Sequence, residues 1–366
     1  MSAQIILGID TSCDDTGVGI VCGGEVVANV VASQTDIHAE FGGVMPEKAS
    51  REHLKMIDLC TQRALNQAGL ELADITTVAA TYGPGLVGAL LVGLNYAKAL
   101  AWARGLDFVP VHHLEGHIAS SLVGLELTTP CLCLIASGGH TSLFEVEALG
   151  SYCELGKTRD DAAGEAFDKA ARLLGLGFPG GPLLSKLAAQ GRIGPYHLPK
   201  PFGKHRGYDF SFSGLKTALS LLVNKLLKER GLDRVLELDI QSRADIAATF
   251  QDRVVTSLVE TALRAAEHIN SSHIIVAGGV AANATLRQRF HDSPLQATFP
   301  PLDLATDNGA MIALAAHFRS MGGERIEGSA HAWAQDAIPY QNLVEASSKP
   351  SECHGKVTIC SEVSSK

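Results

Sequence analysis

The chain has 366 residues, a length that suits two ordinary domains better than one. Hydrophobic residues make up 46% of it and charged residues 19%, which excludes a disordered chain and suits an α/β enzyme. The formal net charge of −9 is opposite to that of a protein that grips nucleic acid mainly through phosphates. A nucleic-acid substrate would need a local basic patch. The best candidate for such a patch is a loop that contains Lys200, Lys204, His205 and Arg206. A plain solvated loop explains these residues equally well.

Cysteine usage and apolar runs indicate the cellular compartment that we expect for the chain. Its eight cysteines form no CxxC pair and are too sparse for a disulfide scaffold, so we expect reduced thiols in the cytoplasm. A first strand from Ile5 would leave no room for a signal peptide. The apolar run 85–101 is interrupted by Asn95 and Lys98, which predicts a buried helix and no membrane span.

In chain order, the first half is expected to begin with a three-stranded meander and to continue with helices and strands in alternation. The expected strands are 5–9, 18–21, 26–31, 78–81 and 108–111, and the expected helices are 46–68 and one that ends near 103. Gly23-Gly24 marks a hairpin turn. In the helix 46–68 the apolar positions at helical spacing are Leu54, Ile57, Ala64, Leu65 and Ala68.

The meander pattern recurs from residue 131, which predicts an internal duplication. The expected elements are strands 132–136, 141–146, 152–155 and 274–277, and helices over 245–269, from about 283–285, and over 308–318. Two similar α/β halves predict two lobes with a cleft between them. We place the first lobe at 1–128, the second at 129–345, and a disordered tail at 346–366.

Two histidines and a distant aspartate predict a metal site. His113 and His117 are four residues apart, which puts both imidazoles on one face of a helix. Most such pairs are caps or surface residues, but this pair follows a strand end, and Glu115-Gly116 gives little reason for packing. Asp307, in a turn ahead of a helix, would complete a site that suits iron(II) or zinc.

The run from His112 to His117 also invites comparison with zinc proteases. In the protease motif a glutamate directly follows the first histidine and acts as the base. Here Glu115 comes two residues after His113, about 200° around the helix and away from the metal face. The sequence therefore disfavours a protease.

Glycine-rich turns predict a phosphate and substrate pocket. The turn 137–141 lies between two strands, where backbone N–H groups can form an anion nest, unless it is a plain hairpin. Glu165 and Asp168 share a helix face and can accept ribose hydroxyls, although a solvated acidic face is more common. A Pro/Gly turn exposes the Gly181 backbone, and Asn283 at a helix start can cap the helix or reach a ligand.

Nine motifs occur in an order that resembles a single family. They are 9–16 (IDTSCDDT), 83–86 (GPGL), 113–117 (HLEGH), 137–141 (SGGHT), 164–169 (GEAFDK), 179–182 (PGGP), 209–216 (DFSFSGLK), 277–280 (AGGV) and 306–309 (TDNG). Each motif alone is weak, but nine in order are specific. Over about residues 5–320 the chain resembles the bacterial-type tRNA N6-adenosine threonylcarbamoyltransferases, formerly called O-sialoglycoprotein endopeptidases.

This resemblance implies a fold and an activity. The fold is the duplicated actin-like ATPase fold of sugar kinases and heat-shock chaperones, which agrees with the repeated meander. The activity is transfer of the threonylcarbamoyl group from threonylcarbamoyl-AMP to N6 of the adenosine 3′ of the anticodon, with release of AMP. The tRNAs concerned read codons that begin with A.

The resemblance also implies site residues and partners. The metal ligands are His113, His117 and Asp307, for one divalent ion per subunit, iron(II) ahead of zinc. The substrate contacts are Ile135, Ala136, Ser137, Gly138, Gly139, Asp168, Gly181 and Asn283. Many relatives have aspartate where this chain has Ser185, so a nucleotide contact there is expected to be weaker or different. The implied partners are tRNA, threonylcarbamoyl-AMP, a smaller paralogous subunit, an accessory ATPase and the synthase that makes the adenylate.

The catalytic base and two alternative functions stay open. Asp14 and His140 are both candidates for the base, and the sequence assigns neither. A metal-dependent glycoprotein endopeptidase is supported by the histidine pair alone. A non-catalytic scaffold of the tRNA-modification complex is expected to lack that pair, which this chain keeps.

Overall fold

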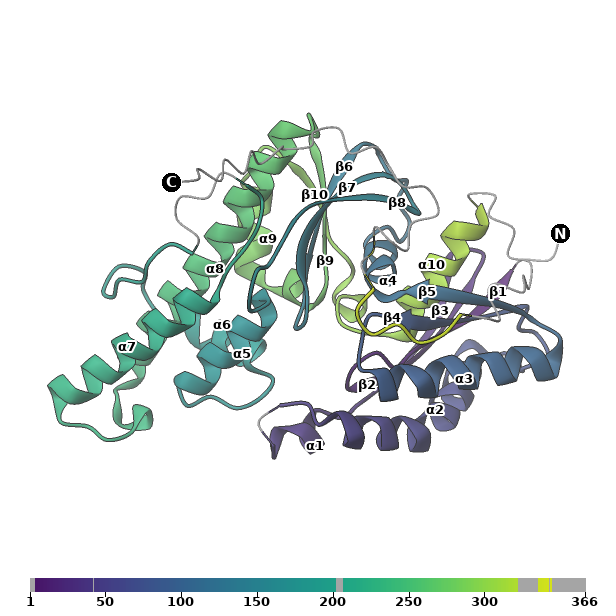
Figure 1. The fold of residues 1–366 in the computed structure, drawn as a ribbon, viewed down its shortest axis with the longest axis horizontal. Coiled ribbons are helices and arrows are strands. Elements are labelled where there is room, and N and C mark those ends of the chain that lie inside the picture. Colours follow the sequence, from purple (N-terminus) through teal and green to yellow (C-terminus); the bar gives the residue numbers. More distant parts are fainter. Residues whose placement is uncertain (1–3, 42, 202–206, 322–334, 342, 344–366) are drawn as a thin grey trace, which may run out of the picture.

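The computed structural model describes residues 4–41, 43–201, 207–321, 335–341 and 343, which form two five-stranded mixed sheets with surrounding helices (Figure 1). Within these residues no helix has the length and apolar character needed to cross a membrane. The apolar run near residue 90 forms a helix that packs on the first sheet. The expected tail 346–366 and three members of the basic loop, Lys204, His205 and Arg206, lie outside the described residues.

The first sheet combines a hairpin meander with two parallel strands, in the order β3-β2-β1-β4-β5. Its strands are β1 (Ile5–Asp10), β2 (Asp15–Cys22), β3 (Glu25–Ser33), β4 (Thr77–Gly83) and β5 (Asp107–His112). Strand β1 pairs antiparallel with β2 and parallel with β4. Gly23 and Gly24 both take positive φ values between β2 and β3, as a tight hairpin turn requires.

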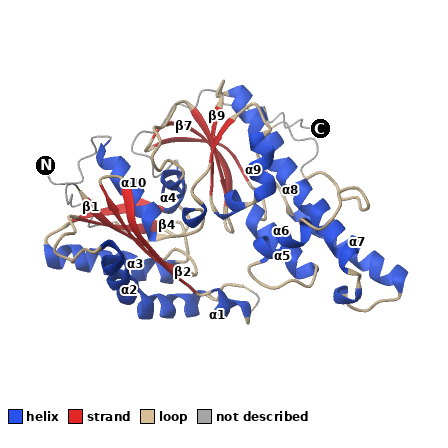
Figure 2. Ribbon diagram, turned by 180° about the vertical axis from the view of Figure 1, so that it is seen from behind, coloured by secondary structure: helices blue, strands red, loops and turns tan. Residues whose placement is uncertain are grey.

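Helices cover both faces of this sheet (Figure 2). They are α2 (Pro46–Ala68), α3 (Val87–Arg104), α4 (His113–Ser120) and α10 (Gly309–Met321), while the short α1 (Thr35–Ala39) follows β3 outside these layers. Because successive strand residues point to opposite faces, Leu7 packs in the cluster with α2 and α3, and Ile6 packs in the cluster with α10. The predicted helix 46–68 is confirmed, but Leu54 is 66% exposed and is not a core position.

The second sheet repeats the first, with the order β10-β9-β6-β7-β8. Its strands are β6 (Cys131–Ala136), β7 (Thr141–Ala148), β8 (Ser151–Lys157), β9 (His273–Ala277) and β10 (Gln296–Thr298). Strand β6 pairs antiparallel with β7 and parallel with β9, as β1 does with β2 and β4. The predicted duplication is confirmed.

The helices of the second half pack on one face of this sheet and on one another, while α4 lies on the other face (Figure 1). They are α5 (Ala163–Leu173), α6 (Gly180–Ala188), α7 (Ser213–Arg230), α8 (Ile240–His268) and α9 (Ala284–His291), with short turns η1 (Val235–Glu237), η2 (Gly279–Ala282) and η3 (Leu302–Leu304). Helix α8 begins earlier than the pattern predicted because Asp239 caps it, accepting a 2.7 Å hydrogen bond from the Ser242 amide.

Helix α10 follows the second sheet in sequence but packs on the first. Glycines in β1 and β2 make this close approach feasible. A Cβ on Gly8 would lie 2.3 Å from the Gly309 oxygen, and a Cβ on Gly19 would lie 2.2 Å from the Ala310 nitrogen. Within the described residues the chain passes between the sheets through α4 and again between β10 and α10, and Leu343, shortly after Ile338 on the first sheet, packs against the second. The expected boundary between the two lobes at residue 128 stays a prediction. It assigns α10 to the second lobe, whereas α10 packs on the first sheet.

Candidate metal centre and substrate loops

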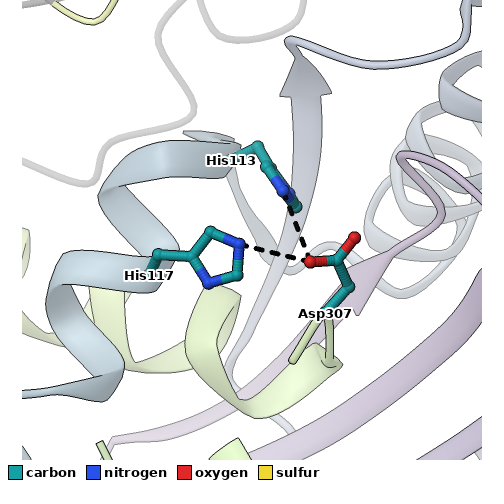
Figure 3. Close-up of side chains that lie close together, drawn as sticks. All are labelled: His113, His117 and Asp307. Carbon is teal, nitrogen blue, oxygen red and sulfur yellow. Dashed lines mark ion pairs between the residues drawn. The ribbon is translucent and has the colours of Figure 1, made fainter. Parts of the chain in front are cut away.

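The structure brings the three predicted metal ligands together (Figure 3). His113 and His117 lie on one face of α4, and Asp307 lies just ahead of α10. The Nε2 atoms of His113 and His117 are 3.6 and 3.2 Å from Oδ1 of Asp307. Both imidazoles are buried, whereas the Asp307 side chain is 26% exposed. The ligand atoms all lie within 4.8 Å of one another, so they can share one ion.

His117 supplies the test of whether these side chains fit a metal. Both of its ring nitrogens are buried, and neither has a hydrogen-bond partner among the described residues. Its approach to Asp307 lacks hydrogen-bond geometry. A buried nitrogen without a partner is costly. Because imidazole nitrogens beside a carboxylate oxygen are a donor set of first-row divalent ions, the residues fit a metal.

The end of β1 orients His113. Its Nδ1 lies 3.2 Å from the Ser12 hydroxyl and 3.5 Å from Oδ1 of Asp10. Asp10 is itself held by the Thr81 hydroxyl at 2.5 Å. With Nδ1 engaged there, Nε2 faces Asp307. Sequence analysis did not assign this role to Asp10 or Ser12, although an acid at the end of a central strand was the available signal.

The pKa shifts of His113 and Asp307 show that this cluster favours a positive charge next to an ionised carboxylate. Burial by itself would lower the pKa of His113, but the Asp307 and Asp10 carboxylates raise it to about 9. Burial likewise opposes ionisation of Asp307, but His113 and His117 hold the pKa of its carboxyl well below its usual range. The Asp307 carboxyl therefore stays ionised.

The expectation that Glu115-Gly116 leaves little reason for packing is wrong. Glu115 is 2% exposed, and its Oε1 accepts from the Tyr152 hydroxyl and from Nε of Arg319, each at 3.2 Å. Arg319 lies on α10 and Tyr152 on β8, so Glu115 ties α4 to both. A Cβ on Gly116 would lie 2.9 Å from the Ile312 side chain. Glycine thus lets α4 lie close to α10, which brings the histidines to Asp307.

The geometry does not provide a protease arrangement. Glu115 is bound to Arg319 and Tyr152 and cannot serve as a base beside the ion. His112, the other histidine of the run, caps α4 by accepting a 3.3 Å hydrogen bond from the Leu114 amide. Burial lowers the pKa of His112 to about 3.

The turn after β6 leaves two backbone donors open beside the metal ligands. An added Cβ on Gly138 or Gly139 would meet nothing within 4 Å, and neither amide donates a hydrogen bond to another described residue. The Ser137 hydroxyl closes the turn by accepting from the His140 amide at 3.1 Å. The ring centroids of His140 and His113 are 6.5 Å apart. The turn can therefore bind an anion next to the histidine pair.

Close backbone contacts fix this turn from two sides. The Gly164 amide at the start of α5 donates to the Ser137 carbonyl at 3.0 Å, and a Cβ there would lie 2.6 Å from that oxygen. Gly278, with φ of 87°, would place a Cβ 2.6 Å from the Ala136 oxygen. Ile135 and Ala136 are fully buried at the end of β6, directly ahead of this turn. The chain thus holds the open donors rigidly.

The Asp168 side chain, from α5, reaches Gly181 at the start of α6. Oδ1 of Asp168 accepts from the amides of Gly180 and Gly181 at 2.7 and 3.3 Å. Burial raises the pKa of Asp168, and these two N–H groups oppose the shift. The Pro/Gly turn expected here is the first turn of a helix, and a Cβ on Gly181 would meet open space. Glu165, by contrast, is 44% exposed and pairs with Lys169 at 2.8 Å.

Asn283 caps α9 and is held by two neighbours. Its Oδ1 accepts from the Leu286 amide at 3.0 Å. Its Nδ2 donates to the Ser185 hydroxyl at 3.0 Å and to Oε1 of Gln251 at 2.9 Å. A ligand acceptor would meet Nδ2 only by replacing one of those bonds, whereas Oδ1 keeps a second lone pair for a ligand donor. Gln251 was not expected in the site, because nothing local marks a glutamine in the middle of α8 as a partner of α9.

Solved structures share the architecture at low sequence identity. HypF from T. kodakarensis matches with a TM-score of 0.56 and 12% identity, covering 88% of this chain and 48% of that one. Component A of the Acidaminococcus fermentans (R)-2-hydroxyglutaryl-CoA dehydratase matches with a TM-score of 0.51 and 16% identity, covering 87% and 99%. The chain therefore has the duplicated actin-like ATPase fold that was predicted.

Sequence comparison gives the family. The family model for tRNA N6-adenosine threonylcarbamoyltransferase matches residues 25–314. Relatives with this name include those of Thermus thermophilus, 54% identical over 88% of this chain and 94% of the relative, and of Caldicellulosiruptor bescii, 46% identical over 94% and 100%. The chain belongs to the tRNA N6-adenosine threonylcarbamoyltransferase family, as the motifs predicted. It is an acyltransferase that modifies tRNA, and neither a protease nor a scaffold is favoured.

Proposed function

We propose that His113, His117 and Asp307 hold the divalent ion of this transferase, iron(II) ahead of zinc. The observation that carries this proposal is that neither buried nitrogen of His117 has a hydrogen-bond partner among the described residues, while its Nε2 lies 3.2 Å from Oδ1 of Asp307. We further propose a nucleotide site made by residues of the β6 turn and of α5, α6 and α9. Its members are Ile135, Ala136, Ser137, Gly138, Gly139, Asp168, Gly181 and Asn283.

The proposed donor is threonylcarbamoyl-AMP, a mixed anhydride with a good leaving group. The adenosine N6 forms a bond to the carbamoyl carbon, the bond from that carbon to the phosphate oxygen breaks, AMP leaves, and N6 loses a proton. When bound, the ion supplies positive charge that stabilises negative charge on the donor. The open amides of Gly138 and Gly139 hold the phosphate as its charge increases. Asp168 keeps the start of α6 in place beside it.

The proposed acceptor is the adenosine 3′ of the anticodon in tRNAs that read codons beginning with A. We place the reaction in the cytoplasm, with a smaller paralogous subunit, an accessory ATPase and a synthase that supplies the adenylate. These assignments rest on the order of the nine motifs together with family membership.

Reconstitution tests the proposed function directly. The full chain is mixed with those partners, threonine, bicarbonate, ATP and unmodified tRNA, and the nucleosides are analysed by mass spectrometry. We expect threonylcarbamoyladenosine only when this chain and a divalent ion are both present. Equal product in the presence of a strong chelator, or metal-dependent cleavage of a glycoprotein without any modified nucleoside, would contradict the proposal.

Gly139→Ala separates ligand contact from packing. The new methyl group meets no protein atom within 4 Å, so the free energy of unfolding should stay unchanged. It occupies the space where the donor phosphate is proposed to lie, so kcat/KM for the donor should fall by at least about tenfold. Gly214→Ala on α7, where a methyl group also meets nothing, is the matched control and should keep full activity. Equal activity of the two variants would remove this turn from the site.

A further inference from the structure

A polar pocket on the second lobe lies beside α8 and is separate from the site described above. It has a volume of about 240 Å³ and is lined on one side by α8 and on the other by the segments around Lys200 and Asp209. Three of its lining side chains are basic, namely Lys200, Arg253 and Arg264. None of its lining residues belongs to the metal cluster or to the proposed nucleotide site. We call it the α8 pocket.

The two acidic side chains of the α8 pocket are already paired. Asp209 accepts a 2.6 Å hydrogen bond from Nε of Arg159, and its other oxygen accepts from the Lys157 amide at 3.0 Å. Glu260 pairs with Lys200 at 3.3 Å, and both of these side chains are more than half exposed. A solvated pair of that kind exchanges partners at little cost. The acids therefore do not neutralise the inner wall of the pocket.

Among the described residues, Arg253 has no counter-ion. Its Nε is buried and has no hydrogen-bond partner among the described residues, and no carboxylate of that part of the chain forms an ion pair with it. Thr256 and Ser257, one turn further along α8, also line the pocket. A buried guanidinium donor that lacks an acceptor is costly, and a planar fork of N–H groups matches the oxygens of a phosphate.

We propose that the α8 pocket binds a backbone phosphate of the substrate tRNA, an inference that rests on the proposed function. Two phosphate-bearing substrates take part in that reaction. The donor phosphate is assigned to the β6 turn, which shares no residue with this pocket, so the remaining source is the RNA. The net charge of −9 means that RNA must be met by local basic sites such as this one. Lys200 also belongs to the basic loop that the sequence suggested.

Arg253→Gln in the full-length chain tests this assignment. We expect the Kd for unmodified tRNA, measured by fluorescence anisotropy, to rise about tenfold, because one charged contact is lost. The slope of log Kd against log salt should fall by about one unit or slightly less. Lys200→Gln, a change at an exposed position that folding does not need, should weaken binding several-fold. The matched control is Arg104→Gln at the exposed end of α3, which should leave the Kd unchanged.

Two further titrations distinguish binding of the tRNA backbone from binding of free phosphate or AMP. Inorganic phosphate and AMP are titrated into the same proteins by calorimetry. The proposal is overturned if Arg253→Gln and Lys200→Gln bind tRNA as tightly as the unaltered chain, or if only inorganic phosphate or AMP binding is lost. It is also overturned if the unaltered chain fails to bind tRNA at low salt. Because binding is measured without transfer, a reconstitution that gives no modified nucleoside would contradict the proposed function and leave the pocket standing.

Discussion

Asp307→Asn should abolish formation of the modified nucleoside and weaken divalent-ion binding by on the order of 100-fold or more, while the protein stays folded. Oδ1 of Asp307 faces the Nε2 atoms of both histidines, so one oxygen supplies the negative charge on the side where these nitrogens meet. Asparagine keeps the shape and removes that charge. Product is measured by nucleoside mass spectrometry, bound metal by elemental analysis after dialysis, and folding by circular dichroism.

A nearby aspartate provides the matched control. Asp303 is exposed in the short turn η3, a few residues ahead of Asp307, and Asp303→Asn should keep both metal and activity. His113→Ala should behave like Asp307→Asn, because it removes another ligand of the same cluster. Normal metal content and full product with Asp307→Asn would show that this carboxylate is not a ligand.

Gly19→Ala should lower the free energy of unfolding by about 3 kcal/mol. The added Cβ would lie 2.2 Å from the nitrogen and 2.4 Å from the Cα of Ala310, which are backbone atoms that cannot rotate away. Helix α10 would have to shift on the first sheet, and the Asp307 turn would shift with it. The affinity for a divalent ion should therefore fall together with stability. Urea denaturation measures the first effect, and metal titration measures the second.

Substitutions of two other glycines serve as controls for this loss of stability. Gly214→Ala meets no atom and improves helix propensity, so it should leave stability unchanged or raise it by up to about 1 kcal/mol. Gly116→Ala meets the flexible end of Ile312 at 2.9 Å and should fall between the two. If Gly19→Ala unfolds at the same urea concentration as the unaltered chain, the close contact of α10 with β2 is not what fixes the Asp307 turn.

Local patterns in the sequence were enough to predict the repeated meander and the helix 46–68. Hairpin glycines and apolar periodicity act over a few residues, so they can be read without knowing the rest of the fold. The return of α10 to the first sheet could not be read in this way. It depends on a glycine groove formed by Gly8 and Gly19 on two strands, and a lone glycine shows only that something approaches closely.

The candidate site likewise has features that the local sequence predicts and features that only the folded chain shows. The spacing of His113 and His117 is local, and their common helix face followed from it. The choice between a cap and a ligand contact for Asn283 depended on Gln251 and Ser185, which reach it from other helices. The role of Glu115 depended in the same way on Arg319 and on Tyr152, which only the folded chain brings near.

Two of the passages of the chain between the sheets have a mechanical consequence. Helix α4 forms one passage, and the segment that contains Asp307 forms the other. Any rotation of one lobe against the other must flex both segments, which makes them the natural hinge. The three candidate ligands sit on that hinge, His113 and His117 on one arm and Asp307 on the other. Because α4 packs closely on α10, a rotation of the lobes is expected to move these side chains together relative to the β6 turn.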